Sequence, residues 1–125
     1  MKPDREEQRI QKEFMKYIAA SGVSGLFAFH IPNGVNSGPV VGKIMKEMGL
    51  VAGMPDLFLI HKGHLFALEI KAPKGRLLPS QILTIAALRE AGVECAVAFG
   101  LDQCIEQLDA WRLTKKYARN LALVS

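Results

Sequence analysis

The chain has 125 residues, of which 50% are hydrophobic and 22% charged, with a formal net charge of +4 and a pI near 9.2. This composition excludes a disordered or collagen-like chain, and the length supports one hydrophobic core, so we expect one domain over residues 1–125. No apolar stretch approaches the length of a membrane span and the charged start is unlike a secretory signal, which favours the cytoplasm. The basic balance is compatible with a phosphate-bearing partner.

The first predicted element is a helix that begins after Asp4 and ends near Ser21. Its apolar positions recur with helical spacing and form one stripe, made of Ile10, Phe14, Tyr17 and Ile18. Glu7 lies close to this stripe, which is an unusual place for a carboxylate. Its spacing from Asp4 is that of a capping box, and this structural interpretation of Glu7 stays open beside a functional one.

A strand is expected from about residue 26 to residue 31, and it runs into the turn sequence Pro32-Asn33-Gly34. Such a turn could present His30 and Asn33 beside a site on the sheet, although a structural role is favoured for His30. The glycine-rich stretch that follows should contain a short helix around residues 41–48.

Two continuous apolar runs, residues 57–60 and 65–70, are separated by the polar tip His61-Lys62-Gly63-His64 and predict a β-hairpin. The middle of this hairpin should be buried on both faces. A two-residue loop and a symmetric four-residue loop both pair His61 with His64, so both predict the same register.

Three charged residues lie at the open end of the hairpin. The register places Asp56 opposite Glu69, and Lys71 follows on the same face two residues along the strand. Two carboxylates about 5 Å apart repel by roughly 3 kcal/mol at an effective dielectric near 20, so a cation is expected beside them. Hard oxygen ligands at this spacing suit Mg²⁺ or Mn²⁺, with the carbonyl of Ile70 as a further ligand. The pattern predicts a metal-dependent nuclease site, against a plain alternative in which Glu69 and Lys71 form a salt bridge and Asp56 caps a turn.

Beyond the hairpin, Pro79 can open a helix that stops at Gly92, with Gln81 in its first turn. An apolar strand is expected over residues 93–99 and a closing helix over residues 101–113. Without the short central helix, the order is α, β, β, β, α, β, α. It predicts an α/β fold with a mixed β-sheet flanked by helices.

The run from Gly53 to Gly75 resembles the PD-(D/E)xK nuclease superfamily, and specifically its VRR-NUC (virus-type replication-repair nuclease) branch. Three further segments are similar to the branch in the same order, namely residues 29–34, residues 46–56, and Gly75-Arg76 followed by Gln81. The four segments follow one another between residues 29 and 81.

The resemblance implies a restriction-endonuclease-like core in which Asp56, Glu69 and Lys71, called the triad below, are catalytic. It implies that Gln81 orients the attacking water or the phosphate, and that Glu7 helps to complete the metal site. The family commonly has a serine before the proline that precedes Gln81. This chain has Leu78 there, which weakens the helix cap.

The resemblance also implies DNA as the partner, branched forms such as Holliday junctions as the preferred substrate, and a homodimer whose interface could lie on the first or last helix. A viral member would act in the cytoplasm of a bacterial host. The residues proposed to bind DNA flank the triad in the sequence: His30, Asn33, Lys43, Lys46, Lys74 and Arg76. Two rivals are a catalytically inactive DNA-binding subunit, for which a broken triad is expected, and a structural α/β protein without a nucleic-acid partner.

Overall fold

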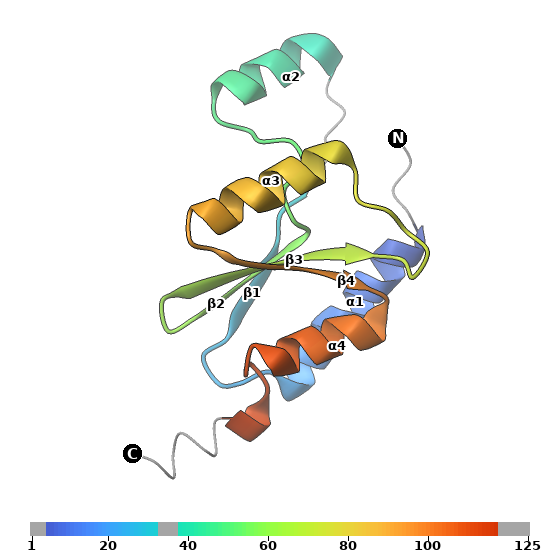
Figure 1. Ribbon diagram of the computed structural model, residues 1–125, viewed down its shortest axis with the longest axis vertical. Helices are drawn as coiled ribbons and strands as arrows, with labels where there is room; N and C mark the ends of the chain where they lie inside the picture. The colour runs from blue at the N-terminus through green and yellow to red at the C-terminus, as the bar shows by residue number, and fades with distance from the viewer. Residues whose placement is uncertain (1–4, 33–37, 118–125) are drawn as a thin grey trace.

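The computed structural model describes residues 5–32 and 38–117, which form helices and strands arranged around one central sheet (Figure 1). The elements expected from the sequence are present, with ends that differ by no more than three residues. In chain order they are α1 (Arg5–Ser21), β1 (Phe27–His30), α2 (Gly38–Glu47), β2 (Leu57–His61), β3 (His64–Lys71), α3 (Pro79–Glu90), β4 (Glu94–Phe99) and α4 (Leu101–Ala110).

The sheet has the strand order β1-β2-β3-β4. β1, β2 and β3 are antiparallel neighbours, whereas β4 runs parallel to β3. The parallel pair is possible because α3 carries the chain back along the sheet before β4 begins. The mixed sheet flanked by helices confirms the expected α/β fold class.

The turn between β2 and β3 consists of Lys62 and Gly63, which have φ angles of 49° and 79°. Positive φ at both central residues is typical of a type I′ turn, whose twist matches that of the flanking strands. His61 pairs with His64, and the ladder continues in the same register toward the open end of the hairpin. The predicted register is confirmed, and of the two loops that were compatible with it the two-residue loop is the one observed.

One face of the sheet packs against α1 and α4 and holds the hydrophobic core. The stripe of α1 predicted from the sequence is buried there, because its residues contact alternate residues of the central strands. The core includes Ile10, Phe14 and Ile18 of α1, Leu57 and Leu59 of β2, Leu68 and Ile70 of β3, Ala98 of β4, and Cys104 and Leu108 of α4.

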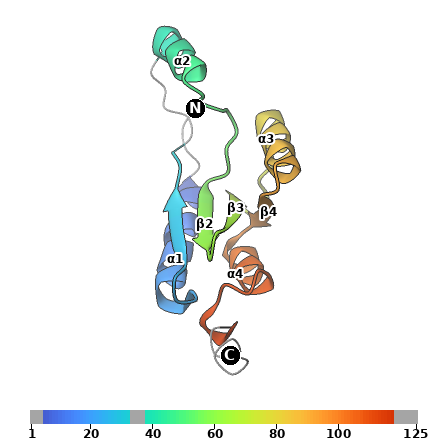
Figure 2. The ribbon, with the colours of Figure 1, turned by 90° about the vertical axis from the view of Figure 1, so that its left-hand side faces the viewer.

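The opposite face of the sheet carries the charged residues, because side chains alternate along a strand and those of Glu69 and Lys71 cannot point toward the same side as Ile70. α3 lies on this side, and Figures 1 and 2 both place α3 and α4 on opposite sides of β3 and β4. α3 buries Thr84 and Ile85, but Ile82 remains 53% exposed. Its apolar residues therefore do not form one core-facing stripe.

α2 lies beyond α3 from the sheet in Figure 1, is separate from both α3 and the sheet in Figure 2, and buries none of its residues. Several of its apolar side chains are exposed, as are others on β1, β2, α3 and the segments beside these elements. We call these residues the exposed apolar set: Phe27, Val40, Val41, Ile44, Met48, Leu50, Val51, Ile60, Leu78, Ile82 and Leu83. Among the described residues, α1 and α4 contribute nothing to this set.

Trp111 follows α4 and packs against the core, with its ring centroid 5.0 Å from that of Phe66 at the start of β3. Trp111 is therefore a partly buried residue at the edge of the core. Within residues 5–32 and 38–117, no helix is both long enough and apolar enough to cross a membrane.

Candidate active site

Asp56 and Glu69 meet at the open end of the hairpin. The ladder ends with Leu57 opposite Leu68, and one further step in the same register places Asp56 opposite Glu69. Asp56 Oδ2 accepts a hydrogen bond of 2.9 Å from the backbone N–H of Ile70. This bond holds the Asp56 carboxylate against β3, next to the residues that flank Ile70.

Glu69 and Lys71 are buried, with 1% and 6% of their surfaces exposed. Loss of hydration and the neighbouring Asp56 carboxylate raise the pKa of Glu69 to about 9, against a smaller lowering by Lys71. Glu69 therefore keeps a proton at neutral pH and can donate it in a hydrogen bond to Asp56. In its charged form Glu69 would require a partner for Oε2, because this oxygen is buried and has no hydrogen-bond partner within the described residues.

The carboxylate pair has the chemistry of a site for a hard divalent cation. An ion in place of the proton would satisfy Glu69 Oε2 and remove the repulsion from Asp56. In the described part of the chain, no group of three or more His, Cys, Asp or Glu side chains is placed to hold an ion. The residues therefore fit an ion with two carboxylates and otherwise carbonyl oxygens and water, which is a common environment of Mg²⁺.

Gln81 contacts the site from the first turn of α3. Its Nε2 donates a hydrogen bond of 3.2 Å to Glu69 Oε1, and its Oε1 accepts one of 2.8 Å from the backbone N–H of Leu78. The second bond replaces part of the missing serine cap, because it satisfies a free N–H at the start of the helix. The substitution at position 78 therefore does not turn Gln81 away from the triad.

The loop before Asp56 is packed directly onto the same turn of α3. Gly53 has a φ of +77°, and a Cβ on it would lie 2.4 Å from the backbone oxygen of Ser80. One residue earlier, the carbonyl of Ala52 accepts a hydrogen bond of 2.6 Å from Thr84 Oγ1. Sequence reasoning did not single out Gly53, although a glycine two residues before the Pro55-Asp56 pair was a signal of close backbone approach.

Glu7 approaches from the first turn of α1. Its Oε2 accepts a hydrogen bond of 3.2 Å from the backbone N–H of Ala72, directly after the triad. Its charge is also a minor cause of the raised pKa of Glu69. Asp4, the other half of the capping box considered for Glu7, lies outside the described residues. The structure thus brings Glu7 to the site, and its role as a ligand stays a prediction.

His30 contacts the backbone of Asp56 rather than its carboxylate. Its Nδ1 is 2.7 Å from the carbonyl oxygen of Asp56, which also accepts a hydrogen bond of 3.3 Å from the N–H of Ile31. This contact matches the structural role that was favoured for His30, since it helps to fix the backbone that carries the Asp56 carboxylate. Asn33, which was predicted next to His30, lies outside the described residues.

The four basic residues predicted to contact DNA lie in two places. Lys74 and Arg76 are exposed in the segment that links β3 to α3, directly after the triad. Lys43 and Lys46 are exposed on α2, which is a separate element beyond α3 (Figure 1). The structure places the first pair next to the triad and the second pair on an outlying helix.

Comparison with known families agrees with this geometry. Residues 35–101 match the model of the VRR-NUC domain, a span that contains the hairpin, the triad and Gln81. The chain belongs to the VRR-NUC family. The resemblance inferred from the sequence is therefore confirmed, and the chain carries a nuclease domain of a family that is usually metal-dependent.

Two solved structures of VRR_NUC domains share the fold of this domain. One named as a VRR_NUC domain protein has a TM-score of 0.72 at 24% identity and covers 91% of this chain and 94% of its own. A second, named as a VRR_NUC domain, has a TM-score of 0.61 at 18% identity and covers 85% of this chain and 97% of its own. The Holliday junction resolvase Hjc of Archaeoglobus fulgidus has a TM-score of 0.48 at 18% identity and covers 74% of this chain and 67% of its own. No curated protein sequence matches the chain.

Proposed function

We propose that this VRR-NUC domain is an endonuclease that hydrolyses DNA phosphodiester bonds with Mg²⁺ or Mn²⁺. The observation that carries the proposal is the buried pair of Asp56 and Glu69 beside Lys71, in which Glu69 Oε2 has no hydrogen-bond partner among the described residues. Two buried carboxylates destabilise a small domain unless a cation compensates them. A purely structural role gives no reason to keep an unsatisfied oxygen in the interior.

The chemistry of hydrolysis assigns a task to each residue of the triad. Asp56, Glu69 and the carbonyl of Ile70 would hold a divalent ion, which when bound would supply Lewis-acid charge toward the phosphate and lower the pKa of water. Lys71 orients the attacking water, assists its deprotonation and stabilises the negative charge that develops as the water oxygen bonds to phosphorus. The bond to the leaving oxygen then breaks, and that oxygen takes up a proton.

Gln81 and Glu7 support these groups from two helices. The Gln81 amide holds one oxygen of Glu69, and the other oxygen, which has no partner among the described residues, would bind the ion. We assign Glu7 a contact through water rather than a direct one, because no three acidic side chains are arranged around a single point in the described residues. The two residues would therefore affect metal affinity less than Asp56 and Glu69.

We propose that the substrate is branched DNA, such as a four-way junction. The contacts assigned to Lys43, Lys46, Lys74 and Arg76 are to phosphates, and phosphate contacts carry no direct sequence information. His30 and Asn33 are assigned to the DNA strand nearest the triad. Selection by the shape of the DNA is the recognition mode that this set of contacts supports.

We further propose that two copies form a homodimer, since two sites are needed to cut opposed strands of a junction. The exposed apolar set supports this, because its side chains are 37–82% exposed and lie on β1, α2, β2 and α3 with the segments beside them. A stable dimer needs about 800 Å² per partner with polar neighbours included, so such an interface would cover several of these side chains together with polar ones.

The dimer can be tested with Leu83→Glu, which places a charge on the exposed apolar set, against Ala19→Glu on the exposed face of α1 as the control. Light scattering after gel filtration should show a dimer for the wild type and the control and a monomer for Leu83→Glu. A wild-type monomer at micromolar concentration would remove the dimer from the proposal.

The enzymatic function is tested by incubating the protein with Mg²⁺ or Mn²⁺ and linear duplex, single strands, flaps, splayed arms or four-way junctions. We expect metal-dependent cleavage, fastest on junctions, and its loss in Asp56→Ala and Lys71→Ala with folding largely kept. Asp102→Ala and Lys62→Ala, which remove exposed charges elsewhere, serve as matched controls. Wild-type binding of DNA without turnover would instead identify an inactive DNA-binding subunit, and turnover by either triad variant would contradict the assignment.

A further inference from the structure

The outward side of α1 carries a row of four cations that neither the fold nor the proposed site uses. Arg5, Arg9, Lys12 and Lys16 follow one another at intervals of four, three and four residues, and all four are exposed. At 100° per residue they lie within about 40° of a single line along the helix. We call them the α1 basic row.

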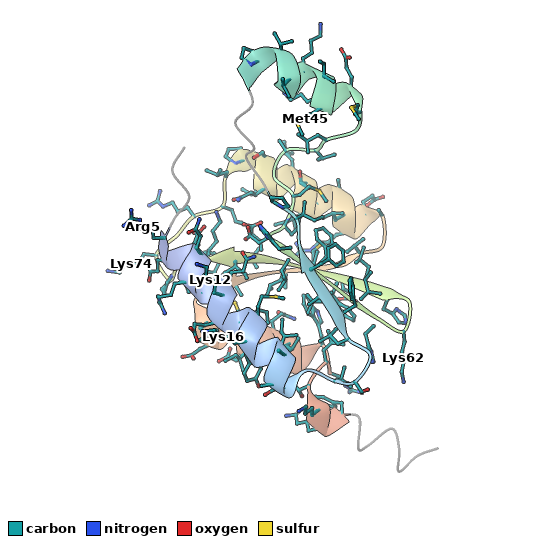
Figure 3. All side chains as sticks on the ribbon, turned by 180° about the vertical axis from the view of Figure 1, so that it is seen from behind. Arg5, Lys12, Lys16, Met45, Lys62 and Lys74 are labelled. Atoms are coloured by element: carbon teal, nitrogen blue, oxygen red, sulfur yellow. The ribbon has the colours of Figure 1, made fainter. Side chains whose placement is uncertain are left out.

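The row lies directly opposite the buried stripe of α1. Ile10, Phe14 and Ile18 point into the core with 0–9% exposure, so the cations form the outer crest of the helix. Figure 3 shows Arg5, Lys12 and Lys16 along this outward side, with Lys74 near the Arg5 end. Because the apolar side of α1 is already buried, the helix cannot insert into a membrane surface, which would be the other common use of a basic amphipathic helix.

The charges of the row are poorly compensated by the protein. Within residues 5–32 and 38–117 the row makes one ion pair, between Lys16 Nζ and Glu13 Oε1 at 3.4 Å. Both partners are largely solvated, with 76% and 46% side-chain exposure, so this pair contributes little to stability. Four cations remain aligned over about 17 Å of helix at spacings of about 5 to 6 Å.

The first turn of α1, where the row begins, lies next to the proposed active site, and Glu7 contacts that site from the side of the helix opposite the row. Glu7, in the first turn of α1, accepts the hydrogen bond from Ala72, one residue after Lys71. The turn that follows packs against the same carboxylate, because a Cβ on Gly75 would lie 3.3 Å from Glu7 Oε2. DNA with a phosphate at the triad would reach the row by passing the Arg5 end of α1, near which Lys74 lies (Figure 3).

We propose that the α1 basic row binds the phosphate backbone of a duplex arm of the DNA substrate, next to the strand cut at the triad. The inference rests on the proposed function for the identity of the ligand and extends it to a surface outside the site. A duplex carries one phosphate per about 1.7 Å of axis, so a 17 Å row faces several phosphates at once. Contacts of this kind are independent of base sequence.

The test compares two double variants that each lose two charges. Arg9→Gln with Lys12→Gln removes the centre of the row, whereas Lys62→Gln with Lys115→Gln removes exposed lysines from the hairpin tip and from the segment after α4. Binding to labelled duplex and four-way junction is measured in EDTA between about 50 and 200 mM salt. Circular dichroism and Mn²⁺ titration check that both variants keep the fold and the site.

The row variant should bind at least about tenfold more weakly, and the slope of log affinity against log salt should fall by about two. The control should change clearly less. The inference would be overturned if both variants lost the same DNA affinity, if the row variant lost none, or if the wild type did not bind DNA. DNA binding is measured without metal, so the two proposals can fail separately. If the row variant binds DNA more weakly but the wild type never cleaves DNA, only the nuclease proposal is refuted. If the wild type cleaves DNA and the row variant binds DNA as tightly as the wild type, only the proposed DNA contact of the α1 basic row is refuted.

Discussion

Replacing Glu69 by glutamine should change the pH dependence of stability in the metal-free protein. Burial and Asp56 raise the pKa of Glu69 from 4.5 to about 9 in the folded chain. The raised pKa means that the protonated Glu69 side chain contributes fully to the free energy of unfolding below the pKa that it has in the unfolded chain. As the pH rises from there toward the pKa in the folded chain, the free energy of unfolding falls by about 1.4 kcal/mol per pH unit. Glutamine keeps the size of the side chain and does not titrate, so the variant avoids this loss.

Between about pH 5.5 and pH 8, the free energy of unfolding of Glu69→Gln should therefore rise relative to that of the wild type by up to roughly 3 kcal/mol. Urea unfolding in EDTA, followed by far-UV circular dichroism at both pH values, measures the difference. Glu106→Gln, an exposed substitution on α4, is the control and should show no comparable trend. A difference between Glu69→Gln and the wild type that does not vary with pH would refute the description of Glu69 as a buried, protonated carboxyl group.

Three further outcomes are expected. Gly53→Ala should slow single-turnover cleavage at least about tenfold, because its Cβ would lie 2.4 Å from a backbone oxygen in the first turn of α3, whereas Gly42→Ala has open space around it and should not. The affinity for Mn²⁺ should rise up to about tenfold per pH unit below the pKa of Glu69, since binding releases its proton, and calorimetry showing a constant affinity would contradict this. Phe14→Ala should lower the free energy of unfolding by about 3–5 kcal/mol because the ring is fully buried, and denaturation should show a much smaller loss for the exposed Phe27→Ala.

The hairpin and its carboxylates could be predicted because local rules determine them. Two apolar strands joined by Lys62-Gly63 fix one register, and that register alone brings Asp56 opposite Glu69. The first helix was predictable for a similar reason, since its apolar residues recur with a single clear period. In both cases the signal lies within about twenty residues of continuous sequence and does not depend on how distant segments pack.

Other features depend on contacts between distant segments and left weak signals in the sequence. The contact of His30 with the carbonyl of Asp56, and that of Glu7 with the backbone of Ala72, require packed elements and follow no short-range pattern. α3 is apolar on several sides, so its periodicity could not indicate that Leu83 would be 72% exposed. The basic row on α1 is different, because its spacing is visible in the sequence but cations on a helix are usually no more than a solvated face.

The packing of Trp111 gives the protein a built-in optical reporter. It is the single tryptophan of the chain, and its partner Phe66 lies five residues before Lys71 on β3, a separation of about 17 Å along a strand. Its emission should therefore respond when the whole domain loses its tertiary structure and stay nearly constant while ions are titrated into the carboxylate pair. Fluorescence can thus separate ligand binding from global unfolding in the wild-type chain, without an added label.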